Sequence, residues 1–282
     1  MTCCDYPKFI EIQFHNKCNS YCLICPYKDM NYDYENMSDE LFDKFLNEID
    51  ETKLVRLIPY LNNEPFLDSH YLDKIEKIRD RFNKVEIEIS SNVSLIKESD
   101  LERLKRLNIT ELRLSVFGFS KDCYKKMMPG LNHDITFKKL KIISDYMKDS
   151  STIVSIVMID NGEIPEIEFN HMRELCDDLG FKFERWGFLD RSNNVKYKSN
   201  NINNPKVVSC EQNRPLERMH ILSDGRVIMC CQDWSHSIVL GNINNNTIKE
   251  IWNSKKYNDI RESLYDKNKE SPKICKHCKL GH

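Results

Sequence analysis

Apolar positions along residues 9–186 follow two alternating periods. Short apolar runs that favour β-strands separate segments in which apolar residues return every three or four positions, as on one face of a helix. Six strands that alternate with helices predict a parallel sheet, and six are too few for a complete eight-stranded barrel. The predicted strands cover residues 9–14, 54–61, 85–90, 111–116, 152–159 and 181–186. The predicted helices cover residues 38–51, with Ser38 as N-cap, 71–82, 100–107, 137–147 and 166–179.

A polar, asparagine-rich segment over residues 192–205 ends this pattern and is typical of a linker or a long surface loop. Beyond it, two short apolar runs flank Ser223-Asp224-Gly225-Arg226, which predicts a hairpin. Two short helical patterns follow. The fold class expected is α/β, a partial barrel followed by a small second domain.

The domain boundaries follow from the same break in the pattern. We predict a first domain over residues 1–191, a linker over 192–206 and a second domain over 207–282. A unit as small as the second, with few large apolar side chains, needs a further stabilising element, and bound metal is one.

Charge and apolar content narrow the possible partners. The chain has 44 acidic and 42 basic side chains, so it carries no strong field of one sign for a nucleic acid or an anionic membrane surface. No apolar run approaches the roughly 18 residues that a membrane span requires. The chain also lacks a basic start leading into an apolar stretch, so we expect a cytoplasmic protein without a secretion signal.

The chain has twelve cysteines, and in a reducing compartment clustered thiols are expected to hold metal or to perform chemistry rather than to form disulfides. Cys18, Cys22 and Cys25 lie within eight residues, directly after the first predicted strand, where parallel barrels place their active sites. Three thiols leave one iron of a [4Fe-4S] cluster open to a further ligand, which a purely structural cluster does not need. The alternatives are a zinc loop and three free thiols.

The second group of thiols is Cys210, Cys230 and the terminal pair Cys275-x-x-Cys278. Four thiolates complete a metal site, so a cluster held there has no open iron and carries electrons or stabilises the domain. A structural zinc site has the same ligand set and is the alternative. Cys231 competes with Cys230 as ligand, and the Gly225-x4-Cys230 spacing favours Cys230.

The first motif, CxxxCxxC after the first strand of a partial (β/α)6 barrel, resembles that of the radical S-adenosylmethionine (SAM) enzymes. Asn62-Asn63-Glu64-Pro65, Ser90-Ser91-Asn92 and Ser115-Val116-Phe117-Gly118 follow or end successive strands and resemble the cofactor-binding strand ends of that family. Ile24 stands where the family has an aromatic residue, and Asn62-Asn63 replaces two glycines. The resemblance implies that SAM is bound by Asn63, Glu64, Ser90, Asn92 and Ser115.

The second domain resembles the SPASM/Twitch extension of the same family. The similar segments are residues 223–231, Leu240-Gly241-Asn242-Ile243 and Ile251-Trp252-Asn253-Ser254. This resemblance implies two [4Fe-4S] clusters, one catalytic and one auxiliary, and a flavodoxin- or ferredoxin-type reductant. It also implies that SAM is cleaved to a 5'-deoxyadenosyl radical, which removes a hydrogen atom from the substrate.

We expect an enzyme that oxidises a small polyol or an aminosugar-type substrate, because the chain is similar in size and cluster inventory to the 2-deoxy-scyllo-inosamine dehydrogenases. The main alternative is maturation of a ribosomally made peptide by epimerisation, thioether formation or crosslinking. The first strand starts at residue 9, which leaves no room for the leader-binding domain that many peptide modifiers carry. An alternative of another class is a non-enzymatic iron-sulfur electron carrier.

Three residues are predicted to act on the substrate. A dehydrogenase needs a group that accepts the hydroxyl proton, and Arg185 and Asp233 are the candidates for that role or for binding the substrate. An epimerase needs a thiol that returns a hydrogen atom, for which Cys231 is the candidate. The interpretation that competes for Arg185 and Asp233 is an ion pair.

Overall fold

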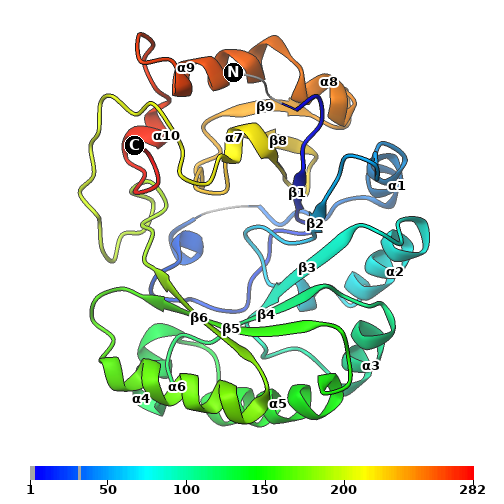
Figure 1. Cartoon of the computed structure of the whole chain (residues 1–282), viewed down its shortest axis with the longest axis vertical. Helices are drawn as coiled ribbons and strands as arrows, with labels where there is room; N and C mark the ends of the chain where they lie inside the picture. Colours follow the sequence, from blue (N-terminus) through cyan, green and yellow to red (C-terminus); the bar gives the residue numbers. More distant parts are fainter. Residues whose placement is uncertain (1–3, 31–32) are drawn as a thin grey trace. The chain divides into compact units, whose positions relative to one another are not determined.

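The computed structural model describes residues 4–30 and 33–282. Residues 1–3 and 31–32 lie outside the description, and residues 1–3 belong to the chain start from which we expect no secretion signal. Strands and helices alternate through most of the chain (Figure 1). The strands are β1 (Phe9–Ile12), β2 (Arg56–Ile58), β3 (Glu86–Ser91), β4 (Glu111–Ser115), β5 (Ile153–Asp160), β6 (Lys182–Gly187), β7 (Arg218–Ile221), β8 (Arg226–Ile228) and β9 (Val239–Asn242).

The helices begin and end close to their predicted bounds where the apolar period is clear. Ser38 caps the first helix as predicted, since its side chain accepts a hydrogen bond from the Leu41 N–H. The helices are α1 (Asp39–Asn47), α2 (Tyr71–Arg81), α3 (Glu98–Arg106), α4 (Lys121–Met127), α5 (His133–Met147), α6 (Glu166–Leu179), α7 (Arg214–Glu217), α8 (Ile248–Trp252), α9 (Lys255–Tyr265) and α10 (Lys273–Lys276).

The described chain divides into two compact units that interleave in sequence. The first unit comprises residues 1–16, 29–62 and 189–282, and the second comprises residues 17–28 and 63–188. The predicted domains run in chain order instead, and their boundaries stay a prediction.

The second unit is built on four parallel strands in the order β3-β4-β5-β6. Helices α3, α5 and α6 lie together on one side of these strands in Figure 1. Fully buried Ile89, Leu112 and Ile156 form part of the core, as the apolar runs predict. Helix α6 ends at Gly180, whose φ of 70° is the left-handed conformation that stops a helix.

The first unit has the strand order β2-β1-β7-β8-β9. The predicted hairpin is confirmed, because β7 and β8 pair antiparallel. Strand β1 pairs in parallel with β2 on one side and with β7 on the other. The pairing of β1 with β7 was not predicted, because these strands lie far apart in sequence and neither carries a local signal for the other.

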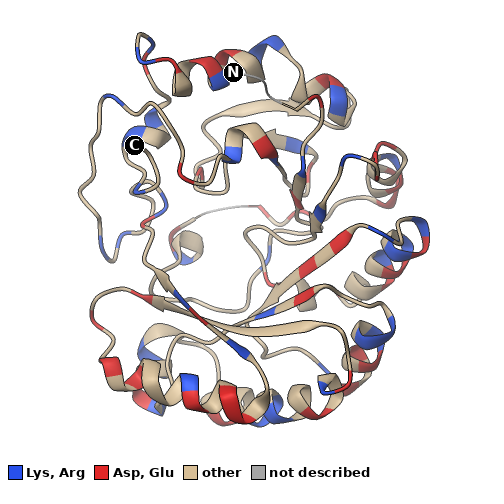
Figure 2. Cartoon of the chain, in the orientation of Figure 1, with Lys and Arg blue, Asp and Glu red and all other residues tan. Residues whose placement is uncertain are grey.

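Both signs of charge are interspersed along the surface helices (Figure 2), as the near equality of acidic and basic residues predicts. Among the described residues, the helices are all too short or too polar to cross a membrane.

Candidate functional site

The loop that carries Cys18, Cys22 and Cys25 is fixed by main-chain hydrogen bonds within the second unit. The Leu23 N–H donates to the Met127 carbonyl oxygen at 2.9 Å. The Tyr27 hydroxyl accepts a hydrogen bond from the Cys18 N–H at 2.9 Å. All three thiols are half-buried, so they are screened from bulk water without being enclosed.

Burial raises the pKa of the Cys18 thiol to about 12, and burial raises that of Cys22 as well. Free thiols in this loop therefore stay protonated at neutral pH. A bound metal reverses that preference, because a coordinating thiol is deprotonated by the metal charge.

Glu64 is a fully buried carboxylate beside this loop. Its main-chain N–H donates to the Lys17 carbonyl oxygen at 2.9 Å, which ties it to the residue before Cys18. Its side chain accepts hydrogen bonds from the Ser91 hydroxyl at 2.8 Å and from the Asn92 N–H at 2.7 Å. Burial raises the pKa of Glu64 to about 7, so the carboxyl lies near the midpoint of its titration at neutral pH.

A chain of side-chain amides joins the end of strand β3 to the cysteine loop. Asn92 donates from Nδ2 to Oδ1 of Asn19 at 2.8 Å, and Asn19 donates from its own Nδ2 to the Ser94 hydroxyl at 2.9 Å. Asn19 is one of the residues between Cys18 and Cys22. The structure therefore brings together three sequence-predicted features, the cysteine loop, Glu64 and Asn92.

The other predicted cofactor residues are less closely tied to this network. Ser91, rather than Ser90, contacts Glu64, because successive side chains of a strand point to opposite faces. Ser115 ends β4 beside Val157 of β5, and Asn63 is half-buried directly before Glu64. Asn19 and Ser91 were missed, since no spacing rule separates them from their neighbours.

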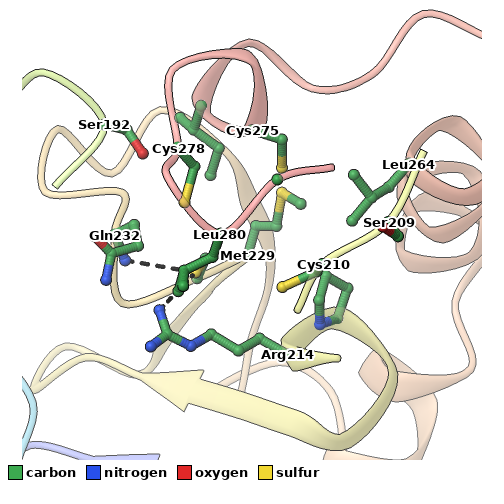
Figure 3. Close-up of a pocket in the computed structure, with 14 residues that line it drawn as sticks. Ser192, Ser209, Cys210, Arg214, Met229, Gln232, Leu264, Cys275, Cys278 and Leu280 are labelled. Atoms are coloured by element: carbon green, nitrogen blue, oxygen red, sulfur yellow. Dashed lines mark hydrogen bonds between the residues drawn. The ribbon is translucent and has the colours of Figure 1, made fainter. Parts of the chain in front are cut away.

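Four thiols of the first unit converge on one pocket (Figure 3). Cys210, Cys230, Cys275 and Cys278 all line this four-thiol cavity. Figure 3 shows the sulfur atoms of Cys210, Cys275 and Cys278 directed toward the same region. The apolar side chains of Met229, Leu264, Ile274 and Leu280 complete the wall.

Two N–H groups are directed at the sulfur atom of Cys230. The Arg214 guanidinium donates from Nη1 at 3.8 Å, and the Gln232 main chain donates at 3.5 Å. Donors of this kind, and a buried positive charge, stabilise the electron-rich sulfur atoms of an iron-sulfur cluster. The donor set and its shell therefore fit a four-thiolate cluster.

Cys231 does not line the four-thiol cavity, although its thiol contacts that of Cys230. Its sulfur atom lies within 4.8 Å of a ring nitrogen of His220 and of a carboxylate oxygen of Glu11. His220 is fully buried, and its Nε2 is 3.5 Å from the Glu11 carboxylate. Burial lowers the pKa of the His220 imidazole, but the Glu11 carboxylate and Cys231 raise it by more, so that this pKa is about 9.

Arg185 and Asp233 are both engaged by neighbouring groups. The Arg185 guanidinium forms ion pairs at 2.8 Å with Asp160 and with Glu166, and it lies 3.9 Å from the ring centroid of Phe169. The buried Asp233 carboxylate accepts hydrogen bonds from Ser237 and from the Ile238 N–H within its own loop. These contacts are those of structural residues, and the catalytic roles stay predictions.

The two groups of thiols lie in segments that match known protein families. Residues 12–169 match the radical SAM superfamily. Residues 210–279 match SPASM, an iron-sulfur cluster-binding domain. The first match contains Cys18, Cys22, Cys25 and Glu64, and the second contains the four thiols that line the four-thiol cavity.

Individual proteins are similar over shorter or more divergent stretches. An S-adenosyl-L-methionine-dependent 2-deoxy-scyllo-inosamine dehydrogenase of Niallia circulans is 32% identical over 54 residues, which are 19% of this chain and 22% of that protein. BtrN, solved with AdoMet and 2-DOIA, superposes with a TM-score of 0.65 at 16% identity, over 96% of this chain and 92% of BtrN.

SuiB of Streptococcus suis, solved with the precursor peptide SuiA, superposes with a TM-score of 0.76 at 14% identity, over 99% of this chain and 71% of SuiB. At such low identities, the two structural likenesses show a shared fold.

Proposed function

Because the chain belongs to the radical SAM superfamily, we propose that it is a radical enzyme with two [4Fe-4S] clusters. Cys18, Cys22 and Cys25 would hold the catalytic cluster, and Cys210, Cys230, Cys275 and Cys278 the auxiliary one. When bound, the catalytic cluster and SAM together supply a 5'-deoxyadenosyl radical that removes a substrate hydrogen atom, and the auxiliary cluster supplies an electron acceptor.

The observation that carries this proposal is the hydrogen-bonded path from Glu64 through Asn92 and Asn19 into the cysteine loop. Because this path includes Glu64 and Asn92, it supports a SAM site beside the three thiols. Glu64 would bind the amino group of SAM, with Asn63, Ser90, Asn92 and Ser115 completing the cofactor site. Hydrogen bonds from Ser91 to Glu64 and from Asn92 to Asn19 would hold the Glu64 and Asn92 side chains in one orientation.

We propose that the substrate is a small polyol or an aminosugar-type molecule and that the reaction is its oxidation. The local similarity to the 2-deoxy-scyllo-inosamine dehydrogenase supports this choice, although it spans only 22% of that protein. Maturation of a ribosomally made peptide is the second candidate, supported by the likeness to SuiB over 99% of this chain.

A flavodoxin- or ferredoxin-type reductant in the cytoplasm would reduce the catalytic cluster, and the predicted domains 1–191 and 207–282 would carry one cluster each. Arg185 and Asp233 remain the proposed groups for substrate or proton binding. Cys231, beside His220, remains the proposed hydrogen donor for an epimerase.

The test of the radical chemistry is anaerobic reconstitution with iron and sulfide, followed by SAM and dithionite. We expect 5'-deoxyadenosine, quantified by chromatography, and its loss in a Cys18→Ala, Cys22→Ala, Cys25→Ala variant that still holds the auxiliary cluster. A fully iron-loaded chain that makes no more 5'-deoxyadenosine than this variant would disprove the proposal.

Two matched variants test whether Cys230 or Cys231 is a ligand of the auxiliary cluster. We expect Cys230→Ala to lose about half of the bound iron, because it removes one thiolate of the four-thiol set. Cys231→Ala is the control and should retain the iron content of the parent protein, because Cys231 lies outside the cavity. The reverse result would assign the ligand to Cys231.

A further inference from the structure

A second, polar cavity lies within the first unit, at the carboxyl ends of its parallel strands. Gln13 directly follows β1, and Asn62 lies in the segment that follows β2. The cavity measures about 220 Å³, which is room for a ligand smaller than the drug-sized molecules of typical pockets. The carboxyl ends of parallel strands are also where α/β proteins bind their ligands.

The charged groups of the wall leave an excess of negative charge. Asp33 and Glu35 contribute two carboxylates, whereas Arg226 contributes one positive charge and already forms an ion pair with Asp224. Burial, together with Arg226, lowers the pKa of His236, so its imidazole is neutral at pH 7. A cationic group on a ligand would therefore be favoured over an anionic one.

The acidic segment is held in place before any ligand binds. Asn16, itself buried, donates from Nδ2 to the Asp33 carbonyl oxygen at 2.7 Å and accepts at Oδ1 from the Glu35 N–H at 3.1 Å. Fixing both ends of this short segment limits the positions of the two carboxylates. Such preorganisation lowers the entropic cost of binding.

The inner wall offers neutral hydrogen-bonding groups. Gln13 is 2% exposed, and its Oε1 accepts a hydrogen bond from the Asn62 N–H at 3.2 Å. Asn62 is 7% exposed, and its Nδ2 is buried without a hydrogen-bond partner among the described residues. A buried amide donor without an acceptor is destabilising, and a ligand hydroxyl would relieve that cost.

We propose that this cavity binds the substrate and that the substrate carries several hydroxyl groups and a protonated primary amine. Glu35 and Asp33 bind the amine, and the amides of Gln13 and Asn62 bind hydroxyl groups. This inference rests on the proposed function and chooses, among its substrates, an aminated polyol. A neutral polyol lacks the charge that the carboxylates favour, and a peptide lacks the ring of hydroxyl groups.

The experiment measures equilibrium binding by anaerobic calorimetry to the reconstituted protein with SAM present and no reductant. The first probe is 2-deoxy-scyllo-inosamine, the second is the same cyclitol with a hydroxyl group in place of the amine, and the third is Nα-acetyl-lysine methylamide. We expect the aminocyclitol to bind at least tenfold more tightly than either of the others. Equal affinity for the first and third probes would show that the polyol is not recognised and overturn the assignment.

Two carboxylate variants localise the amine. Glu35→Gln is expected to weaken aminocyclitol binding about tenfold or more, because a charge-assisted hydrogen bond is lost, and to leave binding of the neutral cyclitol unchanged. Glu51→Gln is the matched control, an exposed carboxylate of the same unit outside the cavity. Unchanged aminocyclitol affinity in both Glu35→Gln and Asp33→Asn would overturn the proposal.

The calorimetric binding measurement does not depend on turnover. Production of 5'-deoxyadenosine without substrate tests the radical chemistry, and the calorimetric comparison tests the cavity. A protein that makes 5'-deoxyadenosine but binds none of the cyclitols would keep the proposed radical function and disprove this site. Asn62→Leu gives a second readout, since removing the unpartnered amide should weaken binding of both cyclitols alike.

Discussion

The Glu64 carboxylate accepts a hydrogen bond at 2.7 Å from the main-chain N–H of Asn92, and Glu64 is buried. Burial raises the pKa of Glu64 from its ordinary value of 4.5 to about 7 despite this bond and the one from Ser91. The folded protein therefore binds the Glu64 proton more tightly than the unfolded chain does.

A pH dependence of stability follows from this shift. The contribution of Glu64 is fully present below pH 4.5 and is lost as the pH rises through about 7, because only the folded state resists ionisation. The loss is on the order of 3 kcal/mol of unfolding free energy. Urea unfolding of the parent protein and of Glu64→Gln across this range should give curves that diverge with pH, and parallel curves would contradict the assignment.

Asp233→Asn is expected to destabilise the first unit. The Asp233 carboxylate accepts from Ser237 and from the Ile238 N–H, and an amide would direct a donor at one of these donors. Each buried group left without a partner costs about 1–3 kcal/mol. Thermal unfolding and iron content measure the effect. A variant of unchanged stability with abolished substrate oxidation would instead support the predicted catalytic role.

Arg185→Gln separates the proposed substrate-binding role of Arg185 from a purely structural one. A purely structural role predicts slightly lower stability and intact chemistry. The variant loses ion pairs to Asp160 and Glu166, and partly exposed pairs of this kind contribute about 1 kcal/mol or less. Arg185→Lys retains the charge, and its stability should lie between that of the parent protein and that of Arg185→Gln. The measurement is kcat for substrate oxidation beside the unfolding free energy. A large loss of kcat without loss of stability would favour the catalytic interpretation.

Gly225→Ala is expected to distort the turn between β7 and β8. Gly225 has a φ of 85°, and an added Cβ would lie 2.6 Å from Nδ2 of Asn244. Strain of this kind costs about 1–3 kcal/mol. Gly180→Ala is the control, with a similar φ of 70° but open space around the new atom, and should cost about 1 kcal/mol. If urea unfolding gave equal losses of unfolding free energy for the two variants, the Asn244 side chain would have moved away from the new Cβ of residue 225.

The sequence predicted the fold best where apolar runs were long. All six predicted barrel strands are present, and the first five contain buried aliphatic residues. Strand β6 has no buried residue and is held by its parallel pairing with β5. Helix α4 was missed because it has only seven residues, two of them buried, which is too short for a 3.6-residue period to emerge. The parallel partner of β1 could not be predicted, since strand pairing over a long separation leaves no local pattern.

The candidate site was partly predictable from cysteine spacing. Spacing favoured Cys230 over Cys231, and the structure places Cys230 in the four-thiol cavity and Cys231 beside His220. Spacing could not identify Arg214, because its relation to the Cys230 sulfur arises from the fold of a separate segment. It also could not distinguish Ser91 from Ser90, which differ only in the face of β3 to which they point.

The parallel pairing of β1 with β7 also bears on how the chain folds during synthesis. Strand β1 has one hydrogen-bonding edge that stays without its native partner until Arg218–Ile221 has been made. At roughly 5–20 residues per second, the intervening segment of about 200 residues takes about 10 to 40 s to synthesise. The first unit therefore closes only after translation of the second is complete, and β1 is the exposed edge in the meantime.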